Sequence, residues 1–310
     1  MVKIGVLLPG QGAQAVGMGK AFYDRFAEAR ELYQTANRLL GYDLTAMCFE
    51  GPAEALTKTE TCQPALFVTS VAAYAGMMSG SPGLRPVVAA GLSLGELSAL
   101  AVAESLGFAD GVYVVQARAA AMAECAARNP GAMLAVVGLQ QDVIDEACRG
   151  LDGVVAANYN AADQVVLSGT VEGITRAEAV MKERGAKRVI RLEVSGAFHS
   201  PLMQPAADAV RQAIKKVTFK APKFPVVSNV TAAPVDDPAK IPEILVKQIV
   251  SPVRWDASVR WMAGQGAAAF VELPPARVLT ALLRRIDPAL KTTAVDSPDD
   301  LQQLPQQVPS

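Results

Sequence analysis

The chain has 310 residues, of which 51% are hydrophobic and 19% are charged, and its formal net charge is −1. This composition is typical of a globular protein with a large core and excludes a disordered chain. The near-zero net charge gives no reason to expect nucleic acid or an anionic membrane as a partner, so any recognition of charge has to be local.

The cysteines and the start of the chain indicate a cytoplasmic protein without a metal site. Cys48, Cys62, Cys125 and Cys148 stand far apart, without the spacing of a zinc site or of a disulfide framework. The first apolar run is too short for a signal peptide, and no segment approaches the roughly 20 unbroken apolar residues that span a bilayer.

The first part of the chain alternates apolar runs of strand length with segments of helical periodicity. A glycine-rich stretch at residues 10–19 follows the first run and predicts a loop that brings backbone close to a ligand. The segment at 61–78 is apolar nearly all round, which indicates a buried helix. We predict strands at 2–8 and 86–92, and helices at 20–40, 61–78, 94–103 and 109–128.

The middle of the chain has a different pattern. Between about residues 130 and 195 the order of expected elements is β-α-β-β-α-β, which is the ferredoxin-like arrangement. The strands are expected at 132–137, 154–158, 164–168 and 187–194, and the helices at 141–149 and 171–184. We therefore predict a small domain at 130–195, inserted into a larger α/β domain made of residues 1–129 and 196–296.

The last part returns to the pattern of the first. It predicts helices at 201–216, 242–250 and 277–286, and strands at 224–228 and 267–273. The stretch 297–310 carries proline, glutamine and aspartate without periodicity. We predict that it is disordered.

Ser93 is the first candidate for chemistry. The sequence Gly91-Leu92-Ser93-Leu94-Gly95 fits G-x-S-x-G and lies between an expected strand and an expected helix. A sharp strand-to-helix turn with glycine on both sides projects the serine hydroxyl from the sheet edge, which is the geometry of a nucleophile elbow. The alternative is a tight structural turn that carries an incidental serine.

A serine nucleophile needs a base, and His199 is the one histidine of the chain. It lies in a glycine-containing loop between an expected strand and an expected helix, where the active-site residues of α/β proteins collect. Taken alone, this position is equally consistent with a surface histidine or with a core histidine whose nitrogens are hydrogen-bonded. Together with Ser93 it predicts a serine–histidine pair in which His199 accepts the hydroxyl proton.

Two backbone groups and one cation complete the candidate set. The N–H groups of Gln11, in the first glycine-rich loop, and Leu94, after the serine, are placed to form an oxyanion hole. Arg118 lies in the alanine-rich helix at 109–128. Either its head reaches solvent, or it is buried and binds an anion, for which a carboxylate is the natural bidentate partner.

These motifs occur in one order along the chain: GQGAQ, GLSLGE, Gln116-Ala117-Arg118, GAFHSPLM, and Gln248 followed by SPVRW. Together they resemble the malonyl-CoA:acyl-carrier-protein transacylases of bacterial fatty-acid synthesis, which are related to the acyltransferase domains of polyketide synthases. The resemblance covers residues 3–286. It implies an α/β-hydrolase-like large domain with an inserted ferredoxin-like small domain.

The resemblance also implies roles for single residues. Ser93 would be the acylated nucleophile and His199 its base, oriented by a main-chain carbonyl near Gln248 instead of a carboxylate. Arg118 would hold the malonyl carboxylate, and Gln11 and Leu94 would supply the oxyanion hole. Gln63 and Asn160 match positions that line the cleft. Phe198 matches the position associated with malonyl over methylmalonyl.

Two segments depart from the family pattern. The family has histidine before the serine, where this chain has Leu92, so we expect polar support to be lost there but catalysis to be kept. The GPGK segment of the family reads Pro274-Pro275-Ala276-Arg277, which keeps the positive charge and changes the turn.

The resulting prediction is a monomeric acyltransferase that passes malonyl from malonyl-CoA to the phosphopantetheine thiol of acyl carrier protein, without a cofactor and with ping-pong kinetics. Other readings stay open. They are an acyltransferase of polyketide synthesis or malonate decarboxylation, a serine thioesterase or esterase, and a catalytically silent carrier-docking protein. A hydrolase would need a triad carboxylate between serine and histidine. By chain order, that acid would be one of Asp110, Asp142, Asp145, Asp152 and Asp163.

Overall fold

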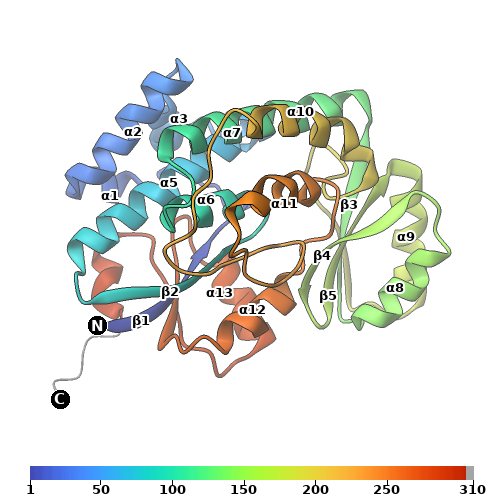
Figure 1. The fold of residues 1–310 in the computed structure, drawn as a ribbon. Coiled ribbons are helices and arrows are strands. Elements are labelled where there is room, and N and C mark those ends of the chain that lie inside the picture. Colours follow the sequence, from blue (N-terminus) through green and yellow to red (C-terminus); the bar gives the residue numbers. More distant parts are fainter. Residues whose placement is uncertain (305–310) are drawn as a thin grey trace.

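The computed structural model of the chain describes residues 1–304 and shows an α/β protein with two separate sheets. One sheet has five parallel strands, and the other has four antiparallel strands. The parallel sheet lies in the part of the molecule that holds the N-terminus, and the antiparallel sheet forms the opposite end (Figure 1). Among the described residues, no helix is long and apolar enough to cross a membrane.

The parallel sheet is built from apolar segments, and both of its faces are covered. Ile4, Val6 and Leu8 pack into the core on one face, and Leu7 packs into the core on the other. A parallel sheet has this character because its crossover connections place helices on both sides. The order across the sheet is β7-β2-β1-β8-β9, where the strands are β1 (Val2–Leu8), β2 (Leu84–Gly91), β7 (Val226–Val227), β8 (Ala269–Glu272) and β9 (Thr292–Ala294).

Two groups of helices cover these faces (Figure 1). On one face, α12 (Trp255–Ala263) and α13 (Val278–Ile286) share an apolar cluster with the strands. On the other face lie α5 (Thr59–Gly80), α6 (Leu94–Val102) and α7 (Phe108–Arg128), and α5 is buried nearly all round, as predicted. The remaining helices of this part are α1 (Lys20–Arg25), α2 (Ala27–Leu40), α3 (Leu44–Glu50), α4 (Ala53–Thr57), η1 (Pro201–Met203), α10 (Gln204–Ile214), η2 (Pro238–Lys240), α11 (Ile241–Gln248) and η3 (Pro298–Gln303).

Residues 131–191 form the antiparallel sheet and two helices that pack on it. The predicted β-α-β-β-α-β order is present, and the strand order across the sheet is β4-β5-β3-β6. The two helices share an apolar cluster with one face, and Met133 and Val166 of the other face join the core of the parallel part. The elements are β3 (Gly131–Val137), α8 (Gln141–Arg149), β4 (Val154–Ala161), β5 (Gln164–Thr170), α9 (Val171–Glu183) and β6 (Arg188–Arg191).

The predicted helix at 20–40 is two helices, α1 and α2, separated at Phe26. The backbone of Phe26 is extended, with φ −115° and ψ 126°. Its ring stacks on Phe22 at 5.9 Å and lies against Gly76 and Gly80 of α5. The apolar face continues through the break because both helices pack on the same core, so periodicity alone does not reveal it.

Short elements account for the other differences. The helices α3, α4 and α12 and the strand β9 were not predicted, and the predicted strand at 187–194 is reduced to β6. Elements of three to nine residues contain too few repeats for a period to be read, and their ends are set by tertiary contacts.

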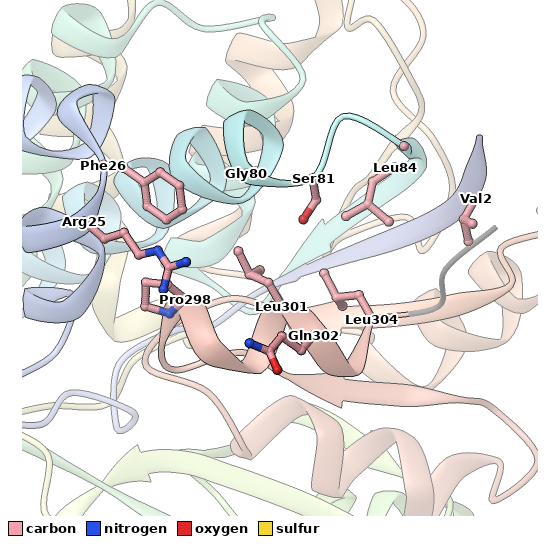
Figure 2. A pocket seen from close by; sticks show the side chains of 11 residues that line it. Val2, Arg25, Phe26, Gly80, Ser81, Leu84, Pro298, Leu301, Gln302 and Leu304 are labelled. Atoms are coloured by element: carbon pink, nitrogen blue, oxygen red, sulfur yellow. The ribbon is translucent and has the colours of Figure 1, made fainter.

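The prediction that the chain is disordered from residue 297 is wrong for the segment 298–303, which is the 3-10 helix η3, and residues 305–310 lie outside the described part. The Ser297 side chain and the Asp300 carboxylate form a capping box at the start of η3. Asp299 pairs with Arg25 at 3.2 Å. Leu301 and Leu304 line a hollow of about 440 Å³ between η3, the end of α5 and the start of β1 (Figure 2).

Candidate active site

Ser93 lies at a sharp turn between β2 and α6, as its motif predicts. Its backbone has φ 54° and ψ −105°, and a positive φ is rare for a residue with a side chain. A Cβ at Gly91 would collide with the backbone of Gly95, and a Cβ at Gly95 would collide with the carbonyl of Leu8. Both glycines are therefore required by the close approach of backbone around the serine, which is the elbow geometry.

His199 lies beside Ser93, in the loop before η1. Its Nε2 is 2.8 Å from Ser93 Oγ, and its Nδ1 is 2.9 Å from the main-chain oxygen of Gln248. A carbonyl oxygen can only accept, so Nδ1 carries the proton and Nε2 is free to accept the hydroxyl proton of Ser93. The ring is 4% exposed. Within residues 1–304, none of the five aspartates considered as triad acids hydrogen-bonds this imidazole.

Burial keeps the imidazole neutral. Burial, which is the largest cause, and the charge of Arg118 together lower the pKa of His199 from the ordinary 6.5 to about 4. The hydrogen bond from Nδ1 to the Gln248 carbonyl acts against this shift and is too weak to reverse it. At neutral pH the ring is therefore in the form that a general base requires.

Arg118 is buried and directed at the serine, so its side chain does not reach solvent. It is 2% exposed. Its Nη1 donates to Gln63 Oε1 at 2.6 Å, and its Nη2 donates to Ser93 Oγ at 3.0 Å and to Gln248 Oε1 at 3.1 Å. Burial lowers the pKa of Arg118 to about 10, which leaves the guanidinium charged at neutral pH. All three acceptors are neutral oxygens, so a ligand carboxylate can gain a full charge pair here.

Gln11 and Leu94, whose backbone N–H groups are the predicted oxyanion donors, both line the same cleft as Ser93. Neither of these two backbone N–H groups has a hydrogen-bond partner within residues 1–304. Leu94 is the first residue of α6, so its N–H is one of the free donors at the positive end of the helix dipole. An oxyanion hole requires two unpaired donors at the cleft that holds the nucleophile, and these two N–H groups meet that requirement.

The cleft above Ser93 has a volume of about 800 Å³ and lies where the parallel and antiparallel parts meet. The predicted residues Gln63, Asn160 and Phe198 all line it. Asn160 Oδ1 is buried and has no hydrogen-bond partner in the described part of the chain. Eight of the nine residues proposed from the sequence therefore line this cleft. The ninth, Gln248, does not line it, and its side chain bonds Arg118.

The two departures from the family pattern differ in their distance from the serine. Leu92 lines the cleft and packs against the apolar cluster that contains α13. Arg277 does not line it: the side chain is 82% exposed and pairs with Asp296 at 3.3 Å. The changed turn, residues 274–277, thus lies outside the lining of the cleft.

Sequence reasoning missed Asn229, whose side chain hydrogen-bonds the backbone of the turn around Ser93. The N–H of Ser93 donates to Asn229 Oδ1 at 2.7 Å, and Asn229 Nδ2 donates to the carbonyl of Gly91 at 2.7 Å. Asn229 is fully buried. It follows β7, the strand next to β2, so an amide directly after a strand of the parallel sheet was the available signal.

Comparison with known proteins decides the family. A family model described as an acyl transferase domain matches residues 6–294. The malonyl CoA-acyl carrier protein transacylase of Bacillus subtilis is 40% identical, over 97% of this chain and 96% of that protein. The chain belongs to the malonyl-CoA:acyl-carrier-protein transacylase family. It is therefore an acyltransferase, and the resemblance inferred from the sequence is confirmed.

Solved structures of this transacylase family have the same fold. An acyl carrier protein S-malonyltransferase from Vibrio cholerae superposes with a TM-score of 0.93 at 38% identity, covering 97% of this chain and 99% of the other. A malonyl-transacylase in complex with a type II PKS acyl-carrier protein superposes with a TM-score of 0.92 at 37% identity, covering 97% and 98%. The α/β fold with one parallel and one antiparallel sheet is thus shared with transacylases of the family.

Proposed function

We propose that this chain transfers the malonyl group of malonyl-CoA to the phosphopantetheine thiol of acyl carrier protein in fatty-acid synthesis. The observation that carries this proposal is the buried guanidinium of Arg118, 3.0 Å from the hydroxyl of Ser93. A carboxylate placed on that guanidinium leaves the thioester carbonyl of a three-carbon diacid beside the serine. Family membership supports the same substrate.

In the first half-reaction, Ser93 attacks the thioester carbonyl while His199 Nε2 takes its proton. The carbonyl oxygen becomes an oxyanion and accepts from the N–H groups of Gln11 and Leu94. When the tetrahedral intermediate collapses, the carbon–sulfur bond breaks, and the proton on His199 goes to the departing CoA thiolate. The products are a malonyl ester on Ser93 and free CoA.

In the second half-reaction, the carrier protein's phosphopantetheine thiol enters the same cleft. His199 takes the thiol proton, and the sulfur attacks the ester carbonyl. The oxyanion forms in the same place, and the carbon–oxygen bond to Ser93 breaks with return of the proton from His199. Because CoA leaves before the carrier protein reacts, ping-pong kinetics are expected.

A transfer assay tests this function. Purified enzyme, malonyl-CoA and holo carrier protein are mixed, and the carrier protein is analysed by intact mass. The proposal predicts a gain of about 86 Da on the holo form, the mass of a malonyl thioester, and no gain on the apo form, which lacks the thiol. Hydrolysis of malonyl-CoA without transfer to the holo form would indicate a thioesterase instead.

The pH dependence of acylation follows from the buried imidazole. Because burial lowers the pKa of His199 to about 4, a base of this kind is more than about 90% neutral above about pH 5. The rate constant for acylation of Ser93 is therefore expected to decrease only as the pH falls toward 4. Single-turnover measurements between pH 4.5 and 8 check this, and an acid limb centred near 6.5 would contradict it.

Phe198 is expected to select against an α-branched acyl group. Its ring is 6% exposed and lines the cleft beside His199, where a methyl branch on malonyl would have to fit. Phe198→Ser removes the ring, and we expect kcat/KM for methylmalonyl-CoA to rise about ten- to hundredfold, the value of one methyl group in a pocket. Steady-state assays with both substrates measure the change. Equal use of both substrates by the unchanged enzyme would dismiss this role.

We also propose that the fold consists of an α/β-hydrolase-like large domain, residues 1–129 and 196–296, with a ferredoxin-like domain inserted at 130–195. Three features support this division. The parallel sheet and its elbow belong to the first unit. The strand order of the second sheet, β4-β5-β3-β6, is that of the ferredoxin-like arrangement. One apolar cluster contains residues of the small unit alone.

The reaction is assigned to the cytoplasm. Cys48, Cys62 and Cys125 are buried and unpaired, which suits a compartment that keeps thiols reduced. Burial also raises the pKa of the Cys48 and Cys62 thiols to about 12, so neither is a nucleophile at neutral pH. Ser93 is thus without a competing thiol nucleophile at those two positions.

A further inference from the structure

Glu96 is a buried carboxylate that the proposed mechanism does not use. It lies in the first turn of α6, three residues after Ser93, and is 2% exposed. A carboxylate in an apolar surrounding is retained at a large cost in desolvation unless its oxygens are hydrogen-bonded. One oxygen, Oε2, accepts from Gln248 Nε2 at 2.6 Å and from the N–H of Asn229 at 3.1 Å.

The contact with Gln248 fixes which way its side-chain amide points. A carboxylate accepts hydrogen bonds, so the nitrogen end of the amide faces Glu96 and the oxygen end faces Arg118. The same nitrogen donates to the main-chain oxygen of Ser93 at 2.9 Å. With the amide reversed, an oxygen would face the carboxylate and a nitrogen would face the guanidinium, and both contacts would be repulsive.

Gln248 also carries the carbonyl that accepts from His199 Nδ1. Gln248 therefore contacts the nucleophile, the base and Arg118, the cation that would bind the substrate carboxylate. Glu96 holds the Gln248 side chain in place. The second donor to Glu96 is Asn229, whose side chain bonds the backbone on both sides of Leu92. A single oxygen of Glu96 thus connects Asn229, which bonds the backbone around Ser93, with Gln248, which bonds His199.

We propose that Glu96 is a positioning residue for the transfer reaction, acting as the hydrogen-bond acceptor that orients Gln248 and, through it, His199 and Arg118. This inference deepens the proposed function and rests on it. Glu96 touches neither substrate nor reacting atoms. Its effect is expected in the rate of acylation more than in substrate binding, because Gln63 also holds Arg118 in place.

The acceptor, and not the negative charge, is the property that matters. Burial raises the pKa of Glu96 to about 7 against the opposing effect of its hydrogen bonds, so the group is only partly ionised near neutral pH. Both accepted bonds end on one oxygen, which a glutamine can replace with its own carbonyl oxygen. The Ser228 side chain also interacts with the carboxyl group of Glu96, and its hydroxyl can accept from a glutamine NH₂ group.

Three substitutions separate these properties. Glu96→Gln keeps an acceptor of the same shape, Glu96→Met keeps the volume without an acceptor, and Glu96→Asp keeps the charge but withdraws it by one methylene. Glu124→Gln, at an exposed position on α7, is the matched control. For each folded variant, thermal unfolding is recorded, and the acylation rate and its malonyl-CoA dependence are measured by single-turnover intact mass well below the unfolding temperature.

The proposal predicts acylation slowed about 10- to 100-fold in Glu96→Met and Glu96→Asp, and within about threefold of the unchanged enzyme in Glu96→Gln, as expected when a residue acts through the geometry of others. The substrate concentration at half-maximal rate is expected to change less than about threefold in all three. If Glu96→Met does not fold, Glu96→Asp carries the test.

Two results would overturn the proposal. Acylation at the unchanged rate in a folded Glu96→Met or Glu96→Asp variant would reduce Glu96 to a structural residue that affects only the unfolding temperature. A Glu96→Gln rate as low as that of Glu96→Met would show that charge, and not the acceptor, is needed. Failure of the unchanged enzyme to form the malonyl adduct would instead refute the proposed function, which the same experiment measures first.

Discussion

Arg118→Ala is expected to lower kcat/KM for malonyl-CoA by two to three orders of magnitude or more. The guanidinium is 2% exposed and bonds only neutral oxygens in the described part of the chain, so the malonyl carboxylate would be the anion in direct contact with it. Losing one partner of a buried charge pair costs about 3–5 kcal/mol, which corresponds to this loss in rate. Acylation by malonyl-CoA and by acetyl-CoA, measured in parallel, gives the selectivity directly.

The same substitution is expected to raise the relative use of acetyl-CoA. In the unchanged enzyme, acetyl leaves the guanidinium buried without a directly bonded anion, and alanine removes that penalty. Arg128→Ala is the control, since Arg128 lies on the same helix, is 75% exposed and pairs with Glu124. If the unchanged enzyme takes acetyl-CoA as readily as malonyl-CoA, the carboxylate role of Arg118 is wrong, whatever the role of Ser93.

The elbow and the histidine were predictable because their signals are local or unique. Gly91 and Gly95 flank Ser93 within five residues, and the strand and helix on either side have clear patterns. Close backbone contact leaves no room for a side chain at either glycine. The turn can therefore be recognised from neighbouring residues in the sequence. His199 needed no placement, since the chain has one histidine.

The contacts around Gln248 could not be predicted from the sequence pattern, although the family resemblance indicated one of them. Its contacts join α11 to α6, α7 and the loop of His199, and the residues involved are separated by 49 to 155 positions in the chain. Neither periodicity nor spacing reports such pairings, because they depend on how helices pack across the sheet. The resemblance placed a carbonyl near Gln248, and the structure identifies it as the carbonyl of Gln248.

Glu96 and Asn229 show a related limit. Glu96 stands inside the GLSLGE motif, and a carboxylate in the first turn of a helix is ordinarily explained by the helix dipole. Its burial and its two donors are visible only when β7 and α11 are packed against α6. Buried polar networks of this kind are long-range, so a helix can be predicted correctly while the role of its polar residue is missed.

The measurement that tests the central claim most directly is the intact mass of the enzyme after brief incubation with malonyl-CoA and no carrier protein. The hydroxyl of Ser93 is 2.8 Å from the neutral nitrogen of His199, and a malonyl ester on it adds about 86 Da. Ser98→Ala, which removes a buried serine inside α6, the helix that Ser93 caps, is the control and is expected to keep the adduct.

The account predicts that the unchanged enzyme gains about 86 Da, that holo carrier protein removes this mass, and that Ser93→Ala gains nothing, because it lacks the oxygen that forms the ester. The expected loss of transfer in Ser93→Ala is complete within detection. A malonyl adduct that persists on Ser93→Ala would contradict the assignment of the nucleophile and, with it, the account of the site.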